Sequence, residues 1–259
     1  MTNLHAAVLG LIQGLGECLP ISSSAHLVVI PRLLGWPDQG LSVDVALHWG
    51  TLAALLLYFW KDWVRLISAG LMSPQSPERR LLLLIVVATV PGGIAGLLFN
   101  RYIEETFRNP ALIALTLMLF GVVLGLADWK GKKSLAIEAL GWGPALWIGA
   151  AQALAIVPGV SRSGITMTAA LILGFKREDA ARFSFLLSVP IVLAAGALKL
   201  RHLHGAALGG PFWVGIAVSA GSGAIAIWAL MGWVRKRSLA PFVVYRLIAG
   251  LALLALSGA

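Results

Sequence analysis

The sequence predicts an all-α polytopic membrane protein, a single domain over 1–259 made of two inverted-topology repeats. Three observations predict this fold. Of the 259 residues, 59% are apolar and only 12% are charged, whereas about a quarter of a soluble domain is charged. Apolar stretches long enough to cross a bilayer also recur along the chain. In each half of the chain, moreover, a proline- and serine-containing turn interrupts one apolar stretch.

The first repeat, 1–133, is expected to begin with a re-entrant helix hairpin over 3–35. Residues 3–16 are apolar but too short to span, since a membrane helix needs about 20 apolar residues, and Glu17 and Pro20 interrupt them. Irregular backbone at membrane depth is tolerated only where protein or a water-filled cavity surrounds it. Two short apolar arms around a polar bend therefore predict a hairpin that enters the membrane without crossing it.

The second repeat, 134–259, is expected to begin with a second re-entrant hairpin over 144–175, interrupted by PGVSRSG at Pro158 to Gly164. The two bends are similar in sequence, because QGLGECLPISSS and AQALAIVPGVSRS share a glutamine, a proline turn and serines. This similarity indicates duplication. Three full spans are expected after each hairpin, six in all, at about 41–60, 81–99, 110–128, 183–200, 212–233 and 241–257.

Loops rich in lysine and arginine are expected in the cytoplasm. This rule places 61–80, 129–143, 175–182 and 234–240 inside, and 100–109, 201–211 and both termini outside. The first hairpin then enters from outside and the second from inside, which gives the repeats inverted topology. The net charge of +9 is accordingly interpreted as loop topology rather than as a surface for nucleic acid.

The first bend collects polar groups that hydrocarbon would penalise. Gln13 and Glu17 are four residues apart and share a helix face, where an amide oxygen and a carboxylate hold a hard divalent cation or orient an imidazole. The simplest interpretation of Ser22 to Ser24 is that they cap the second arm of the hairpin. His26 is either a hydrogen-bonded interior residue or a working base.

In the second bend, Arg162 lies between two serines in a Pro-Gly-bounded turn. A charge at membrane depth needs a partner or water, and a planar guanidinium suits phosphate. If the turn opens a helix, backbone N–H groups of Ser161 to Gly164 face the same anion, and Gly159 and Gly164 permit close approach. Bends that meet at the repeat interface would combine an anion clamp with a carboxylate, hydroxyls and an imidazole, a set sufficient for phosphoryl transfer.

The remaining polar residues receive simpler interpretations. Cys18 is the single cysteine, which excludes an internal disulfide and predicts a small buried side chain. Asp44 and His48 are four apart and either line the mouth of the pocket or form hydrogen bonds at the membrane interface. Arg182 is expected to be a cytoplasmic loop charge, and Arg246 a snorkelling arginine near the inner end of the last span.

These motifs resemble the undecaprenyl pyrophosphate phosphatase family of bacterial inner membranes, over nearly the whole chain. QGLGECLPISSSAHL is similar to the family's first motif, (E/Q)-x-x-x-E followed by L-P-I-S-S-[ST]-x-H, and PGVSRSG to its second. Further resemblance lies in DVALHWGTLAALLLYF, RFSFLLSVPIVLAAG and YRLIAG. There are two departures. Gln13 is the permitted alternative to Glu and leaves a metal site one charge fewer, and Ala25 replaces the usual Gly, which matters if that position needs φ > 0.

The resemblance implies hydrolysis of undecaprenyl diphosphate to the monophosphate and inorganic phosphate, which recycles the lipid carrier for peptidoglycan synthesis. It implies a site that opens to the periplasm and assistance by Mg²⁺ or Ca²⁺. Glu17 and Gln13 would act on the metal or orient the histidine, and Arg162 would clamp the diphosphate. Ser23 and His26 would be the nucleophile–base pair, with attack by Ser23 preferred to attack by His26. Diphosphate binding is further expected from Ser22, Ser24, Ser161, Ser163, Gly159 and Gly164.

Two other classes of function stay open at this point. Inverted repeats are common in transporters, so a transporter or flippase of a polyprenyl phosphate lipid is the alternative, although transport needs no nucleophile. A structural membrane protein with buried polar caps would instead pair Arg162 within the protein. A homodimer is a further expectation, and no nucleic-acid partner is expected.

Overall fold

The computed structural model describes residues 1–37, 41–106, 109–200 and 209–257, and these residues form helices and their connections. This result confirms the all-α prediction. The helices, with two short 3₁₀ segments η1 and η2, are α1 (Asn3–Cys18), α2 (Ser23–Leu33), α3 (Leu41–Tyr58), α4 (Trp60–Met72), α5 (Pro77–Thr106), α6 (Pro110–Lys130), η1 (Ile137–Ala139), α7 (Trp142–Ala153), η2 (Leu154–Ile156), α8 (Arg162–Ile172), α9 (Arg177–Leu200), α10 (Gly210–Val234) and α11 (Ala240–Ser257).

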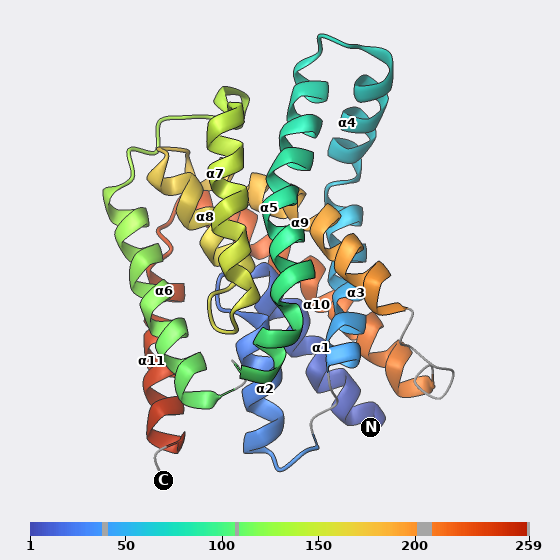
Figure 1. Ribbon diagram of the computed structural model, residues 1–259, viewed down its shortest axis with the longest axis vertical. Helices are drawn as coiled ribbons and strands as arrows, with labels where there is room; N and C mark the ends of the chain where they lie inside the picture. Colours follow the sequence, from blue (N-terminus) through green and yellow to red (C-terminus); the bar gives the residue numbers. More distant parts are fainter. Residues whose placement is uncertain (38–40, 107–108, 201–208, 258–259) are drawn as a thin grey trace.

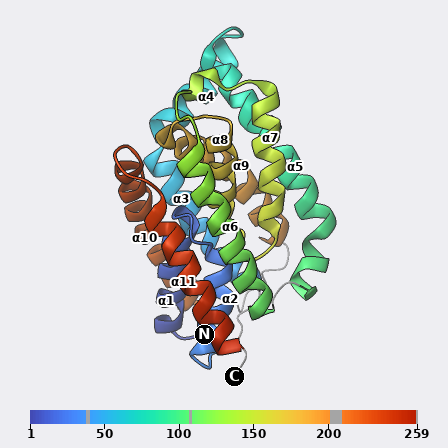
Figure 2. The same ribbon diagram turned by 90° about the vertical axis from the view of Figure 1, so that its left-hand side faces the viewer.

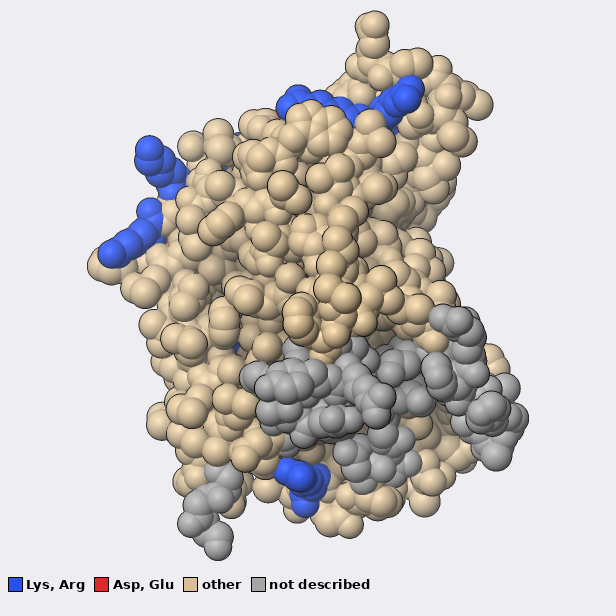
Figure 3. Space-filling view, viewed as in Figure 1, with Lys and Arg blue, Asp and Glu red and all other residues tan. Residues whose placement is uncertain are grey.

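The helices form a bundle with its connections at two ends (Figures 1 and 2). The N-terminus, the start of α6 and the end of α11 lie at the lower end in Figure 1, whereas the α4–α5 and α6–α7 links lie at the upper end. On the face drawn in Figure 3, Lys and Arg gather towards the upper end, with a smaller basic group near the lower end. This arrangement is typical of a membrane protein with basic loops on one side.

The helices are long and apolar enough to identify an integral membrane protein. Many large apolar side chains along them are exposed, which suits a surface that faces lipid. Four stretches have the length and composition of membrane spans, namely Pro77–Phe99, Pro110–Lys130, Arg177–Leu198 and Gly210–Val234. Two shorter helical stretches are also apolar, Ala46–Tyr58 and Ala240–Leu256.

Two predicted loops are in part helical. The loop expected over 61–80 contains α4, which buries Leu66 and leaves Val64, Ile67, Leu71 and Met72 exposed. Charged residues interrupt its apolar sequence, so apolar length alone did not indicate this helix. The loop expected over 175–182 is helical from Arg177, since acidic residues in its first turn suit a helix N-terminus. α5 also extends to Thr106, and most of the loop expected over 201–211 lies outside the described residues.

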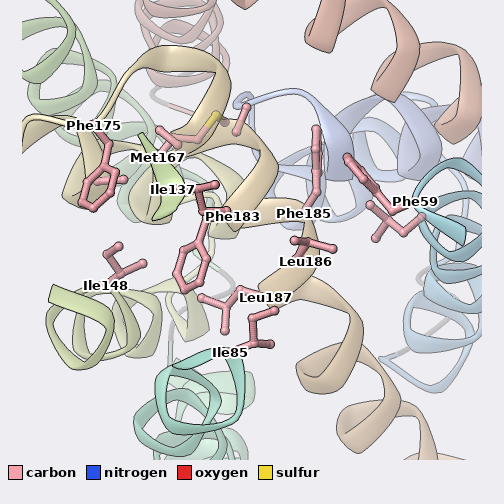
Figure 4. Packing of buried hydrophobic residues seen from close by; sticks show 14 of the residues in the cluster. Phe59, Ile85, Ile137, Ile148, Met167, Phe175, Phe183, Phe185, Leu186 and Leu187 are labelled. Carbon is pink, nitrogen blue, oxygen red and sulfur yellow. The ribbon is translucent and has the colours of Figure 1, made fainter. Parts of the chain in front are cut away.

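The main hydrophobic core surrounds the middle of α9. Phe183 and Leu187 of α9 pack in one cluster with Ile85 of α5 and Ile148 of α7 (Figure 4). Because lipid tails are as apolar as these side chains, close packing rather than release from water stabilises the contact. The packing fixes α9, which contributes Ser184 and Ser188 to the polar site described next.

Candidate active site

The first bend lies between α1 and α2. α1 ends at Cys18 and its cap residue Leu19 is extended, as expected of a residue before proline, since Pro20 disfavours the helical conformation there. Ser22 then adopts a φ of 74°, a left-handed conformation that is uncommon for a non-glycine residue. Ala25 lies inside α2 and is not among the residues with positive φ, so glycine is not needed at this position.

The second bend repeats this geometry between α7 and α8. α7 tightens into η2 and the chain turns through Gly159, whose φ is 95°. Ser161 has a φ of 70° and precedes α8, and its Oγ accepts a hydrogen bond from the Gly164 N–H at 3.1 Å. In both bends a serine with left-handed backbone thus leads into a short helix.

The carboxylate of Glu17 joins the two bends inside the bundle. Arg162 Nη2 donates to Oε1 at 2.6 Å, and Ser23 Oγ donates to Oε2, also at 2.6 Å. His48 Nε2 lies 3.4 Å from Oε2, and Gln13 Nε2 donates to the same oxygen at 3.4 Å. The structure therefore brings together the predicted carboxylate, hydroxyl and guanidinium from opposite halves of the chain.

Further contacts hold Arg162 against this carboxylate. Its Nη1 donates to the carbonyl of Ser184 at 3.1 Å and to the hydroxyl of Ser188. Ser163 Oγ donates to the carbonyl of Leu19 at 3.2 Å and so ties the second bend to the first. Because the ion pair is buried, removing one partner alone costs about 3–5 kcal/mol. The guanidinium is consequently preorganised with its charge directed at the first bend.

His26 has different partners from those the sequence predicts. Its Nδ1 lies 2.7 Å from the carbonyl of Ser22, and its Nε2 lies 2.6 Å from the hydroxyl of Tyr245 on α11. Ser23, the expected partner of His26, instead donates to Glu17. The hydrogen bonds therefore make Glu17, not His26, the group placed to accept the proton of Ser23.

The other serines and glycines of the bends lie close to one another or to neighbouring side chains. Ser22 Oγ lies 3.2 Å from Ser24 Oγ, and Ser161 Oγ lies 3.4 Å from Ser163 Oγ. At Gly159 a Cβ would lie 2.1 Å from Thr116 Oγ1, and at Gly164 a Cβ would lie 2.9 Å from Arg246 Nη1. The close approach that these glycines permit is therefore to α6 and to Arg246.

Arg246 differs from its sequence-based interpretation. It does not snorkel, because its side chain is fully buried. Its guanidinium donates to the carbonyl of Pro20 in the first bend at 3.4 Å, to Gly159 and Val160 in the second at 2.8 and 3.1 Å, and to Leu117 of α6 at 3.0 Å. Arg246, like Arg162, is a charge within an apolar stretch of the sequence, and this signal would have identified it.

The remaining expectations have mixed outcomes. Cys18 is a free, buried thiol, as predicted. His48 lies beside Glu17 in the site, whereas the side chain of Asp44 lies outside the described part of the structure. Arg182 is not a simple loop charge, because it lies in α9 and pairs with Asp62 of α4.

The oxygens of Gln13 and Glu17 suit a hard divalent cation. Gln13 Oε1 is buried and has no hydrogen-bond partner among the described residues, so this oxygen can accept a further contact. The described residues contain no cluster of three or more His, Cys, Asp or Glu side chains. A cation here would need further oxygen ligands from its substrate, which is how Mg²⁺ is usually held.

Fold and site together define a helical integral membrane protein with a buried polar centre suited to an anionic group. The chain belongs to the family described as bacitracin resistance protein BacA, whose family model matches residues 6–252. It is 54% identical to the undecaprenyl-diphosphatase of Trichlorobacter lovleyi, over 100% of this chain and 98% of that protein. It is 52% identical to the undecaprenyl-diphosphatase of Geobacter sulfurreducens over 98% of both chains, and 49% identical to that of Moorella thermoacetica over 96% and 95%.

Proposed function

We propose that the site around Glu17 hydrolyses undecaprenyl diphosphate to undecaprenyl phosphate and inorganic phosphate. Membership of the family and the names of three relatives at about 50% identity support this reaction. The observation that carries it is the single carboxylate shared by Ser23 and Arg162. Buried polar caps alone would also explain an arginine paired within the protein, but neither that interpretation nor a flippase is favoured by relatives named as phosphatases.

In the first step, Ser23 Oγ attacks the terminal phosphorus of the diphosphate. The serine proton passes to Glu17, which already accepts it in a hydrogen bond of 2.6 Å. The new bond is Oγ–P, and the bond that breaks is the P–O bond to the inner phosphate, so undecaprenyl phosphate leaves. Arg162 stabilises the negative charge on the transferred phosphoryl oxygens, and moves from Glu17 towards phosphate as the substrate binds.

In the second step, water attacks the phosphorus of the phosphoserine and the bond between phosphorus and Ser23 Oγ breaks. Glu17 returns the proton that it received to Ser23 Oγ, and the water leaves with both of its protons as part of inorganic phosphate, so the free serine and the carboxylate are restored. Ser161, Ser163, Ser22 and Ser24 would bind the phosphate oxygens when the substrate is present. Splitting the displacement in two is the usual benefit of a covalent intermediate.

Mg²⁺ or Ca²⁺ is part of the proposal. Glu17 and the Oε1 of Gln13, which has no partner among the described residues, would hold it together with phosphate oxygens of the substrate. When bound, such an ion would neutralise charge on the diphosphate. The proposed roles of the residues are the same with or without the ion, because the ion would only add to the positive charge that Arg162 supplies.

The inverted repeats and six spans also belong to the proposal. The chain from Gln13 to Ser22 and from Gln152 to Ser161 has the same length, and each ends at a serine with left-handed backbone. Packing is related in the same way, since α1 packs extensively on α10 and α7 on α5. The α1–α2 and α7–α8 pairs would then be re-entrant hairpins, and α3, α5, α6, α9, α10 and α11 the six spans.

The location is inferred from the same topology. The protein would lie in the bacterial inner membrane with the end that carries the termini facing the periplasm, and the site would open there. The polyprenyl diphosphate would insert its lipid tail between helices from the bilayer. A homodimer stays a prediction that the monomer geometry does not test.

The decisive experiment measures release of inorganic phosphate from a polyprenyl diphosphate by the purified protein in detergent. Ser23→Ala should lower turnover by several orders of magnitude, because the nucleophile is lost. Arg162→Lys keeps the charge but loses the planar fork, and should lower turnover by about 10²-fold. Ser68→Ala is the matched control, since Ser68 bonds only within exposed α4.

The outcomes separate the alternatives. Near-normal turnover in Ser23→Ala with full loss in His26→Ala would reassign the nucleophile to the histidine. An inactive wild-type protein that nevertheless moves lipid across liposomes would replace the phosphatase by the transporter. Folding of each variant is checked by its elution as a single species in gel filtration.

A further inference from the structure

Tyr245 of α11 contacts His26 at the nitrogen through which the imidazole would act. The phenolic oxygen lies 2.6 Å from His26 Nε2, and the two rings are stacked with centroids 5.7 Å apart and an angle of 19°. The two residues are 219 positions apart in the sequence, so the contact depends on the fold. We propose that Tyr245 is a positioning residue that fixes the orientation and tautomer of His26.

The hydrogen bonds of His26 define which nitrogen carries the proton. Nδ1 lies 2.7 Å from the carbonyl oxygen of Ser22, and a carbonyl can only accept, so Nδ1 carries a hydrogen. In the neutral ring Nε2 is then an acceptor, and the hydroxyl of Tyr245 donates to it. When Nε2 gains a proton, the same hydroxyl accepts, because a phenol does both. Tyr245 can thus follow both charge states.

The position of Tyr245 is itself fixed by its neighbour in the chain. Arg246 is fully buried and donates to carbonyls of both bends, including Pro20 and Gly159. The dipeptide therefore anchors α11 to the bends and presents the adjacent tyrosine to α2. Ser22 has a left-handed backbone conformation, and its carbonyl faces Nδ1 on the other side of the imidazole. Two fixed groups consequently hold His26 at both of its nitrogens.

The effect of Tyr245 on turnover rests on the proposed function. Its effect on the orientation and tautomer of His26 does not. An imidazole held at both nitrogens presents Nε2 in one direction, whether it handles a proton or bonds a phosphate oxygen. A substrate that reaches Nε2 of His26 therefore also lies next to the hydroxyl of Tyr245. Loss of the hydroxyl should therefore affect the chemical step more than the binding of the lipid.

The test compares Tyr245→Phe with Tyr58→Phe. Phenylalanine keeps the stacked ring and removes only the hydroxyl; Tyr58 is a half-exposed tyrosine whose ring contacts Phe59. One hydrogen bond is worth about a 3- to 10-fold change in rate. Phosphate release by Tyr245→Phe should show kcat lower by about that factor, KM within about twofold, and wild-type values for Tyr58→Phe.

A spectroscopic measurement separates this inference from the phosphatase assignment. In protein labelled with ¹⁵N-histidine, with His26→Gln used to assign the signals, wild-type His26 should show protonated Nδ1 and unprotonated Nε2. Tyr245→Phe should move the Nε2 signal and leave Nδ1 in place. An Nε2-protonated neutral ring in wild type, or a Tyr245→Phe variant with unchanged kcat and unchanged Nε2 signal, would overturn the inference. Both signals are read whether or not the protein releases phosphate.

Discussion

Arg246→Ala should be among the most destabilising single substitutions in this protein. The buried guanidinium donates to the carbonyls of Gly159, Leu117 and Val160 at 2.8, 3.0 and 3.1 Å, and to Pro20 at 3.4 Å. No carboxylate bonds to it among the described residues, so the hydrogen bonds that stabilise this side chain are those to backbone carbonyls. At about 1–1.5 kcal/mol for each of the three shorter bonds, alanine should lower the free energy of unfolding by about 3–4.5 kcal/mol.

Unfolding in a denaturing detergent, followed by tryptophan fluorescence, measures this loss, and the ten tryptophans give ample signal. Arg246→Lys should be intermediate, since an ammonium reaches fewer of the four carbonyls. Arg235→Ala is the matched arginine control. Its ion pair with Glu178 is exposed, and such pairs are worth about 0–1 kcal/mol. If Arg246→Ala costs no more than Arg235→Ala, Arg246 does not join the two bends and the reasoning fails.

Two further outcomes follow from the site. Gln13→Glu adds a carboxylate beside Glu17 and should raise the affinity for Mg²⁺ or Ca²⁺ by about tenfold or more, measured as the concentration that restores phosphate release after chelation; unchanged affinity would exclude Gln13 as a ligand. Gly159→Ala should destabilise by more than about 2 kcal/mol in the same unfolding assay, because φ is 95° and the new Cβ would lie 2.1 Å from Thr116 Oγ1. Gly143→Ala, where a Cβ meets nothing, is its control.

The sequence allowed prediction of the two bends because their signals are local. A spanning helix needs a long apolar stretch. Glu17 and Pro20 interrupt the first candidate stretch, and the Pro158–Gly164 turn interrupts the second, so each is too short to span. The meeting of the bends also followed from the sequence, since a buried Arg162 needs a partner. The structure supplies that partner as Glu17.

The choice of hydrogen-bond partners inside the site was beyond the sequence. Ser23 and His26 are one turn apart, so a serine–histidine pair was a reasonable expectation. The left-handed Ser22 places its carbonyl at His26 Nδ1, and Tyr245 arrives from the opposite half of the chain. Neither the backbone angle nor the approach of α11 can be read from the residues nearby. α4 was missed for a related reason, because its apolar side chains are interspersed with charges.

The two bends contribute different groups to the candidate site. When the bends are aligned from Gln13 and Gln152, Ser23 corresponds to Arg162 and Glu17 to Ile156. Arg162 and Ser23 accordingly occupy equivalent positions and donate to the two oxygens of one carboxylate. The second bend lacks a counterpart of that carboxylate, and both amide atoms of Gln152 are buried without a hydrogen-bond partner among the described residues. The two bends are therefore complementary, since the first supplies the carboxylate and a hydroxyl and the second supplies the cation.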